Sequence, residues 1–137
     1  MNSLVELYQS TVALHERFNT SQTVQQSLER FTEEYNEVLN EIPDAHRDNI
    51  ANEFVDSLVT IIGVLRSIDK STNEKENYQA MFVVIKGLAE LYFAIRKVHV
   101  ENQHIQEAVQ RVIVKNNAKT VETHYLDQET GKIKRKA

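Results

Sequence analysis

Residues 24–68 read VQQSLERFTEEYNEVLNEIPDAHRDNIANEFVDSLVTIIGVLRSI and contain two segments whose apolar side chains recur at helical spacing. In the first segment these residues are Val24, Leu28, Phe31, Tyr35, Val38 and Ile42. In the second they are Ile50, Phe54, Leu58, Ile61, Leu65 and Ile68. Spacings of three and four residues place such side chains on one face of an α-helix. Pro43 cannot continue a helix, so the stretch predicts two helices joined by a short turn, with Asp44 as the N-cap of the second.

The same helical spacing extends over most of the chain. Further apolar rows predict helices over residues 3–18, 78–100 and 102–118. The 137 residues include only three Gly and one Pro, which is too few turn-forming residues for a β-rich fold. We therefore predict a single all-α domain, a bundle of about five helices over residues 1–119. Residues 120–137 lose the helical period and are predicted to be either a disordered tail or a small hairpin.

The composition limits the classes of function. The chain has no Cys, which excludes disulfides and thiolate metal sites. Its net charge of −4 does not favour binding to nucleic acid, so no such partner is expected. The most apolar stretch, residues 54–65, is too short to span a bilayer, and residues 1–10 lack the pattern of a secretory signal. We therefore expect no membrane partner and a cytoplasmic location.

Two pairs of carboxylates occupy matching positions in the two helical segments. Glu34 and Glu37 in the first, and Glu53 and Asp56 in the second, are three residues apart, so each pair lies on one side of its helix. Counted at about 100° per residue, both pairs have the same offset from the apolar face of their helix. Two helices packed through these faces would bring four carboxylates together. Mg²⁺, or Mn²⁺ in its place, is the cation that suits such a cluster of oxygen ligands.

A solvated acidic edge is the alternative interpretation of these residues. It accounts for Glu34 and Glu37 but fits Asp56 poorly, because apolar residues surround Asp56 in the sequence. These apolar residues give the helix a second apolar face, which predicts a central position for it in the bundle. Burying a bare carboxylate costs several kcal/mol, and no Lys or Arg lies near Asp56 in the sequence. A bound cation would keep Asp56 charged. Together the two pairs favour a metal site, with Glu33 on the far side of its helix and not among the metal ligands.

The acidic pattern resembles the signature of the MazG-like all-α nucleoside triphosphate pyrophosphohydrolases. The order Glu-Glu-x-x-Glu, a gap, and then Glu-x-x-Asp runs over residues 33–56. Leu14–Phe18 is similar to the first-helix pattern of the branch related to phosphoribosyl-ATP pyrophosphohydrolase, and Glu53–Val59 with Gly63 is similar to its acidic helix. Lys115–Lys119 resembles a family motif that ends in Asn-x-x-Lys. The resemblance covers most of residues 12–68 and 105–119.

This resemblance implies a function, a cofactor and partners. Family members cleave a nucleoside triphosphate between the α- and β-phosphates and release a nucleoside monophosphate and pyrophosphate, with Mg²⁺ as the cofactor. They are homodimers or homotetramers. Carried over residue by residue, the family's catalytic and metal-binding positions are Glu34, Glu37, Glu53 and Asp56. The substrate-binding positions are Asn116 and Lys119.

Two other classes of function are compatible with the sequence. A carboxylate-bridged di-iron bundle requires two Glu-x-x-His pairs on facing helices, and the sequence has one, Glu101 with His104, at a predicted helix start. A non-catalytic helical interaction module with an acidic edge would show neither metal dependence nor phosphate hydrolysis. His15 also has two interpretations, as a packing residue on an apolar face or as a contact to the nucleotide base. The sequence does not identify the nucleotide.

Overall fold

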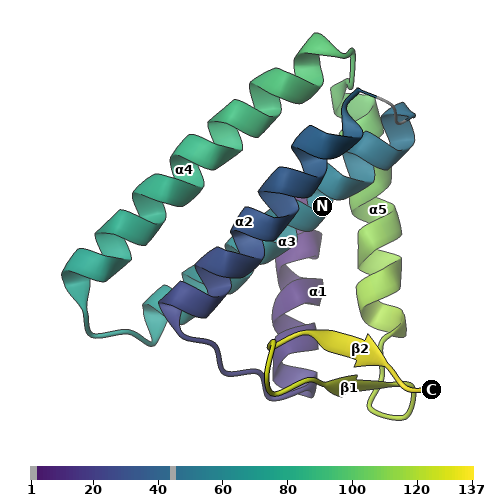
Figure 1. Ribbon diagram of the computed structural model, residues 1–137. Coiled ribbons are helices and arrows are strands. Elements are labelled where there is room, and N and C mark those ends of the chain that lie inside the picture. Colours follow the sequence, from purple (N-terminus) through teal and green to yellow (C-terminus); the bar gives the residue numbers. More distant parts are fainter. Residues whose placement is uncertain (1–2, 44–45) are drawn as a thin grey trace.

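The computed structural model describes residues 3–43 and 46–137, and these residues form five helices and a two-stranded antiparallel sheet (Figure 1). The elements in order are α1 (Ser3–Arg17), α2 (Val24–Glu41), α3 (Arg47–Asp69), α4 (Glu74–Lys97), α5 (Asn102–Ala118), β1 (His124–Leu126) and β2 (Ile133–Arg135). The prediction of an all-α bundle of about five helices is therefore confirmed. Of the two alternatives for residues 120–137, the structure has the hairpin.

Side-chain caps fix where α2 and α3 begin. Thr23 and Gln26 form a capping box, in which the Thr23 hydroxyl accepts from the Gln26 N–H and the Gln26 side chain accepts from the Thr23 N–H. At α3 the N-cap is His46, whose Nδ1 accepts from the Asp48 N–H at 3.3 Å. Asp44, which the sequence predicted as this cap, lies outside the described residues.

The start of α4 was predicted too late. Asn73 is its N-cap and accepts a hydrogen bond from the Glu76 N–H at 3.1 Å, so the helix begins at Glu74 rather than at Tyr78. The apolar period begins only at Tyr78, and for that reason the first turn was missed.

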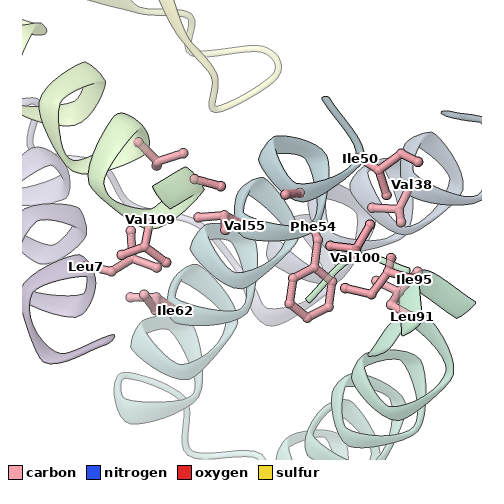
Figure 2. Close-up of a cluster of buried hydrophobic side chains, with 13 residues drawn as sticks. Leu7, Val38, Ile50, Phe54, Val55, Ile62, Leu91, Ile95, Val100 and Val109 are labelled. Atoms are coloured by element: carbon pink, nitrogen blue, oxygen red, sulfur yellow. The ribbon is translucent and has the colours of Figure 1, made fainter. Parts of the chain in front are cut away.

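Helix α3 is the central helix, as its second apolar face predicted, and it packs against each of the other four helices. The largest core cluster surrounds it and draws side chains from all five helices, among them Leu7, Val38, Phe54, Leu91 and Val109 (Figure 2). These side chains are at most 4% exposed. Burial of apolar area of this kind is the main force that holds the helices together.

A second core cluster joins α2 to the first half of α4. Phe31 of α2 packs there with Val64 of α3 and Val84 of α4. Gly87 allows the close approach of α4, because a Cβ at this position would lie 2.7 Å from Cζ of the Phe31 ring. Helix α4 is therefore held to α2 at a point where only a glycine fits without rearrangement.

The outward face of α4 is apolar. Tyr78, Phe82, Ile85 and Phe93 are 72, 69, 63 and 65% exposed, and their spacing puts them on one side of the helix, opposite its buried residues. By length and composition alone α4 is also apolar enough to cross a membrane, with a mean hydropathy of 1.3, a property that core helices of water-soluble proteins share. Figure 1 shows α4 along one side of the bundle.

Candidate metal centre and the adjoining cavity

Three of the four predicted carboxylates lie together between α2 and α3. Glu34 and Glu37 come from α2 and Glu53 comes from α3, and one carboxylate oxygen from each lies within 4.8 Å of the other two. The i, i+3 spacing puts Glu34 and Glu37 on one side of α2, and the packing of α2 against α3 brings Glu53 to the same space. The two helices therefore present oxygen ligands to each other within one chain.

Asp56 lies one turn further along α3, beside this cluster rather than within it. Its charge acts on Glu34, so the two carboxylates lie near each other. However, the nearest cation is a lysine, since Nζ of Lys115 lies 3.7 Å from Oδ1 of Asp56. The fold thus supplies a basic partner that the sequence around Asp56 lacks. Lys115 belongs to α5, 59 positions away in sequence, and only the packing of α5 on α3 brings it close.

Two oxygens of the cluster are buried without a hydrogen-bond partner. Among the described residues, Oε2 of Glu34 and Oε2 of Glu53 are shielded from solvent and accept no hydrogen bond. A buried polar atom without a partner costs about 1–3 kcal/mol, and more if it is charged. A hard cation supplies the missing partner, because Mg²⁺ takes carboxylate oxygens as ligands. The donor set and its unpaired oxygens thus fit a divalent cation.

The electrostatics of the cluster agree with this fit. Burial, followed by the charges of Glu37, Asp56 and Glu53, raises the pKa of Glu34 to about 8. Burial, followed by the neighbouring carboxyl groups of Glu37 and Asp56, raises the pKa of Glu53 to about 7. Both raised pKa values indicate that two or more negative charges between α2 and α3 are unfavourable without a counter-ion.

A cavity of about 250 Å³ opens beside the carboxylates. Glu34 and Asp56 line it on the acidic side, and Gly63, His15 and Gln22 contribute further parts of its surface. The basic residues that line the cavity are Arg30, Lys115, Lys119, Lys132 and Lys134. A small space that combines carboxylates with five cations suits a ligand that carries both a metal ion and several negative charges.

Lys119 is placed at the end of α5, on the surface of this cavity. It is the C-cap residue of α5, and Nη1 of Arg17 donates to its carbonyl oxygen at 2.6 Å, which fixes the backbone there. Its ammonium group makes no ion pair within the described residues. Burial and the nearby charge of Lys115 lower the pKa of Lys119, while Asp56 opposes the shift. Positive charge is therefore in local excess at this end of the cavity.

Asn116 has a packing role in the structure. It is 3% exposed, and its Nδ2 lies 3.4 Å from the Ser10 hydroxyl and 3.3 Å from the Thr11 hydroxyl of α1, to which it donates. These contacts tie α5 to α1 directly behind Lys119. Asn116 also borders the cavity, so its contact with a substrate stays a prediction.

His15 makes a packing contact and also borders the cavity. Its Nδ1 lies 2.6 Å from the Thr20 hydroxyl, and Arg66 donates to the same hydroxyl at 3.3 Å. Burial and the charges of Arg66 and Lys70 lower the pKa of His15 to about 4, so the ring is neutral at pH 7. Both interpretations of His15 thus have a structural basis.

The other candidate ligands have local partners instead. Glu33 forms ion pairs with Arg30 at 3.1 Å and Lys132 at 3.2 Å, and it is not part of the carboxylate cluster. At the start of α5, Nδ1 of His104 accepts from the N–H of Glu101, and the Glu101 carboxylate pairs with Arg96. This pair caps a helix, so the structure offers nothing in favour of the di-iron interpretation.

Four basic residues of the cavity were missed by the sequence reasoning. Two of them had a signal, because Arg30 lies four residues before Glu34 and Lys115 lies four residues before Lys119, so each shares a helix face with a predicted site residue. The other two, Lys132 and Lys134, had none, since they reach the cavity only through the docking of the hairpin.

Comparison of the chain with protein-family models, with curated proteins and with solved structures gave no match in any of the three.

Proposed function

We propose that the protein is a Mg²⁺-dependent nucleoside triphosphate pyrophosphohydrolase with a MazG-like fold, which cleaves its substrate between the α- and β-phosphates. The observation that carries the proposal is the carboxylate cluster of Glu34, Glu37 and Glu53, with two unpaired buried oxygens, at the edge of a basic cavity. Carboxylates beside a cavity lined by five basic residues match the two needs of a metal-bound polyphosphate, oxygen ligands for the metal and cations for the phosphates.

Each group in the site has a place in this reaction. Glu34, Glu37 and Glu53 would hold Mg²⁺, with Asp56 at the border of the cluster. The metal supplies charge neutralisation for the phosphate oxygens and a lower pKa for a bound water. One carboxylate of the cluster accepts the proton of the water that attacks the α-phosphorus. Lys115 and Lys119 attract the phosphates as point charges, and Asn116 keeps the end of α5 in position behind them.

Lys115 has a second role in the proposal. In the protein without ligand it partly neutralises Asp56, across 3.7 Å. Its side chain is 56% exposed but that of Asp56 is only 25% exposed, so Lys115 would exchange Asp56 for a phosphate once a cation neutralises this carboxylate. Lys115 would then bind the substrate phosphates, and Glu34, Glu37 and Glu53 would hold the cation that compensates the charge of Asp56.

The test is an assay of the purified protein with Mg²⁺ and a mixture of nucleoside triphosphates, in which nucleoside monophosphate and pyrophosphate are measured. We expect hydrolysis that stops with a chelator. Substitutions Glu34→Gln, Glu53→Gln and Asp56→Asn are expected to lower kcat/KM by about 100-fold or more, because each removes a charge from the metal site. Glu29→Gln, a change of the same charge on the exposed face of α2, serves as the control and keeps the wild-type rate.

Two results would contradict the proposal. One is a protein that releases no pyrophosphate from any nucleoside triphosphate with either Mg²⁺ or Mn²⁺. That outcome favours the alternative, a non-catalytic helical interaction module with an acidic edge. The other is full activity in the Glu34→Gln and Glu53→Gln variants, which would place the reaction elsewhere in the molecule.

A further inference from the structure

The C-terminal hairpin is docked against the cavity through two contacts with other parts of the chain. Nε2 of Gln22 donates to the Gly131 carbonyl oxygen at 3.3 Å, and Nζ of Lys132 lies 3.2 Å from Oε2 of Glu33. Figure 1 shows the hairpin across the ends of α1 and α5. Gly131, Lys132, Ile133 and Lys134 consequently form part of the cavity surface.

The turn of the hairpin is built for this close approach. Gly131 has a φ of +72°, and a Cβ at this residue would lie 2.7 Å from Nε2 of Gln22. The turn is closed by two backbone hydrogen bonds, from the Gly131 N–H to the Asp127 carbonyl at 2.7 Å and from the Asp127 N–H to the Lys132 carbonyl at 2.8 Å. The positive φ is the reason that a glycine is favoured here, since the Gln22 amide is the end of a flexible side chain and could shift away from a Cβ. The lysine that follows it has a fixed backbone position at the cavity.

The two hairpin lysines differ in how firmly they are held. Nζ of Lys134 lies 2.6 Å from Oδ2 of Asp127 within the hairpin, and the Asp127 side chain is 19% exposed. This ion pair is therefore part of the turn. The pair between Lys132 and Glu33 is open to solvent, with side chains 39 and 50% exposed. Such a solvent-exposed pair contributes little to stability. Glu33 also keeps Arg30 at 3.1 Å, so it does not lose its only cation if Lys132 moves to another anion.

The charge around the cavity points to an anion between the hairpin and α5. Lys115 and Lys119 come from α5, and Lys132 and Lys134 come from the hairpin, so basic residues line the cavity on two separate elements. Glu34 and Asp56 are the acidic residues that line it, and they belong to the candidate metal site. The basic side chains thus outnumber the acidic ones. Lys119 has no ion pair among the described residues, and the partners of Lys115 and Lys132 can be exchanged for a phosphate, so this group of cations suits a polyphosphate.

We propose that the hairpin is a phosphate-binding element of the site, in which Lys132 binds the pyrophosphate part of the substrate and the turn at Gly131 positions it. This inference rests on the proposed function and deepens it, because it assigns residues 120–137 to the substrate site. Lys132 leaves Glu33 when the ligand enters and returns when pyrophosphate departs. Lys134 keeps the turn in shape through Asp127 and adds positive charge.

The test is isothermal titration calorimetry, in which inorganic pyrophosphate is titrated in the presence of Mg²⁺ into the 137-residue protein and into four variants. Lys132→Gln removes the charge and keeps most of the side chain, and it is expected to weaken pyrophosphate binding about tenfold or more, since a charge-assisted hydrogen bond is lost. Lys132→Arg restores affinity to within a few-fold. Arg135→Ala, which removes a charge from the same hairpin away from the cavity lining, serves as the control and binds as the wild type does.

The fourth variant separates binding from anchoring. Glu33→Gln breaks the pair with Lys132 but leaves the lysine charged. If Lys132 binds phosphate, Glu33→Gln binds pyrophosphate as tightly as the wild type or more tightly. If Lys132 only anchors the hairpin, Glu33→Gln loses as much affinity as Lys132→Gln does, and the proposal is wrong. Melting temperatures within a few degrees of the wild type establish that each variant is folded.

The outcome is independent of the assay for hydrolysis. A wild-type protein that hydrolyses nucleoside triphosphates while Lys132→Gln binds pyrophosphate normally would overturn the role of the hairpin and leave the proposed function intact. A wild-type protein that binds pyrophosphate through Lys132 but releases none from any nucleoside triphosphate would support the hairpin as a phosphate-binding element and remove the proposed function. A wild-type protein with no affinity for pyrophosphate overturns the inference directly.

Discussion

The pKa shifts of Glu34 and Glu53 and that of His15 have opposite effects on how the stability of the fold depends on pH. The two carboxyl groups have raised pKa values, about 8 and about 7, against 4.5 in an unfolded chain. The folded protein therefore holds protons that the unfolded chain has lost, and its stability falls as the pH rises from 4.5 toward 8. His15 has its pKa lowered from 6.5 to about 4, so its contribution is complete above pH 6.5 and is lost as the pH falls through 4.

These signs give a prediction for the protein without metal. Above pH 6.5 His15 is neutral in both the folded and the unfolded state, so the carboxyl groups act alone. In a chelator, the melting temperature is expected to fall between pH 6.5 and pH 8. With millimolar Mg²⁺ the melting temperature is expected to rise and to lose this dependence, because the cation replaces the protons. Calorimetry at four pH values with and without Mg²⁺ measures both effects.

The matched variants for this measurement are already defined. Glu34→Gln removes the group with the higher pKa and is expected to flatten the decline in chelator while it weakens the response to Mg²⁺. Glu29→Gln changes the net charge equally and keeps both behaviours. A melting temperature that is independent of pH over this range in the wild type, with no effect of Mg²⁺ or Mn²⁺, would count against the metal site.

Among the elements, the packing of α4 on α2 offers a comparison between two helical glycines. Gly87→Ala places a methyl group 2.7 Å from the buried ring of Phe31, whereas at Gly63 the nearest atom is Nε2 of His15, at 3.8 Å. Overpacking costs about 1–3 kcal/mol, and exchanging a mid-helix Gly for Ala gains about 1 kcal/mol. Gly63→Ala is therefore expected to raise the free energy of unfolding by up to about 1 kcal/mol, and Gly87→Ala to lower it by up to about 2 kcal/mol.

Urea denaturation of the two variants and the wild type measures the difference. Each substitution adds the same methyl group to the interior of a long helix, so both variants gain the same helix propensity. The difference between their free energies of unfolding therefore reports the packing around each methyl group. A Gly87→Ala protein as stable as Gly63→Ala would mean that the Phe31 ring yields freely, and that the close approach of α4 to α2 is not needed for the fold.

The helices were predictable because the relevant information is local. The rows of apolar residues and Pro43 located α2 and α3, and the i, i+3 spacing of Glu34 with Glu37 put their carboxylates on one side of α2. The first turn of α4 was missed because Asn73, rather than an apolar residue, begins it. Local pattern thus determines where a helix lies, while its ends depend on single capping side chains.

The partners of the site residues were not predictable in the same way. Lys115 approaches Asp56 from another helix, and Lys132 approaches Glu33 from the hairpin, across 59 and 99 positions of the chain respectively. No helical period relates such residues, and their contact depends on how α5 and the hairpin pack. The acidic half of the site was therefore visible in the sequence, whereas most of its basic half was not.

In the molecule as a whole, the outward face of α4 is an apolar surface that no other part of the described chain covers. Tyr78, Phe82, Ile85 and Phe93 lie on one side of the helix and are each more than 60% exposed. The first three are four and three residues apart, as in the seam between two interlocking helices, and Phe93 follows about two turns after Ile85 on the same side. Large apolar rows on a surface mark an interaction site, and a helix with this spacing fits against another helix. We propose that α4 of a second copy of the chain covers this face, in a homodimer or as one contact of a homotetramer.

The energies place this association in a measurable range. Burial of a large apolar side chain contributes about 1.5–3 kcal/mol, so four partly exposed side chains on each protomer contribute on the order of 10 kcal/mol. Association costs about 4–15 kcal/mol in lost freedom. The balance is close, and a single charged substitution at the centre of the face is therefore sufficient to separate the protomers.

We expect light scattering after gel filtration to give at least twice the 15.9 kDa mass of one chain for the wild type. Phe82→Glu removes a large ring and places a charge within the apolar face of each protomer, so this variant is expected to elute as the monomer. Gln79→Glu adds the same charge to α4 at a position off the apolar face and is expected to leave the oligomer intact. A monomeric wild type, or one that binds neutral lipid vesicles through α4 in preference to itself, would show that a second copy is not what covers this face.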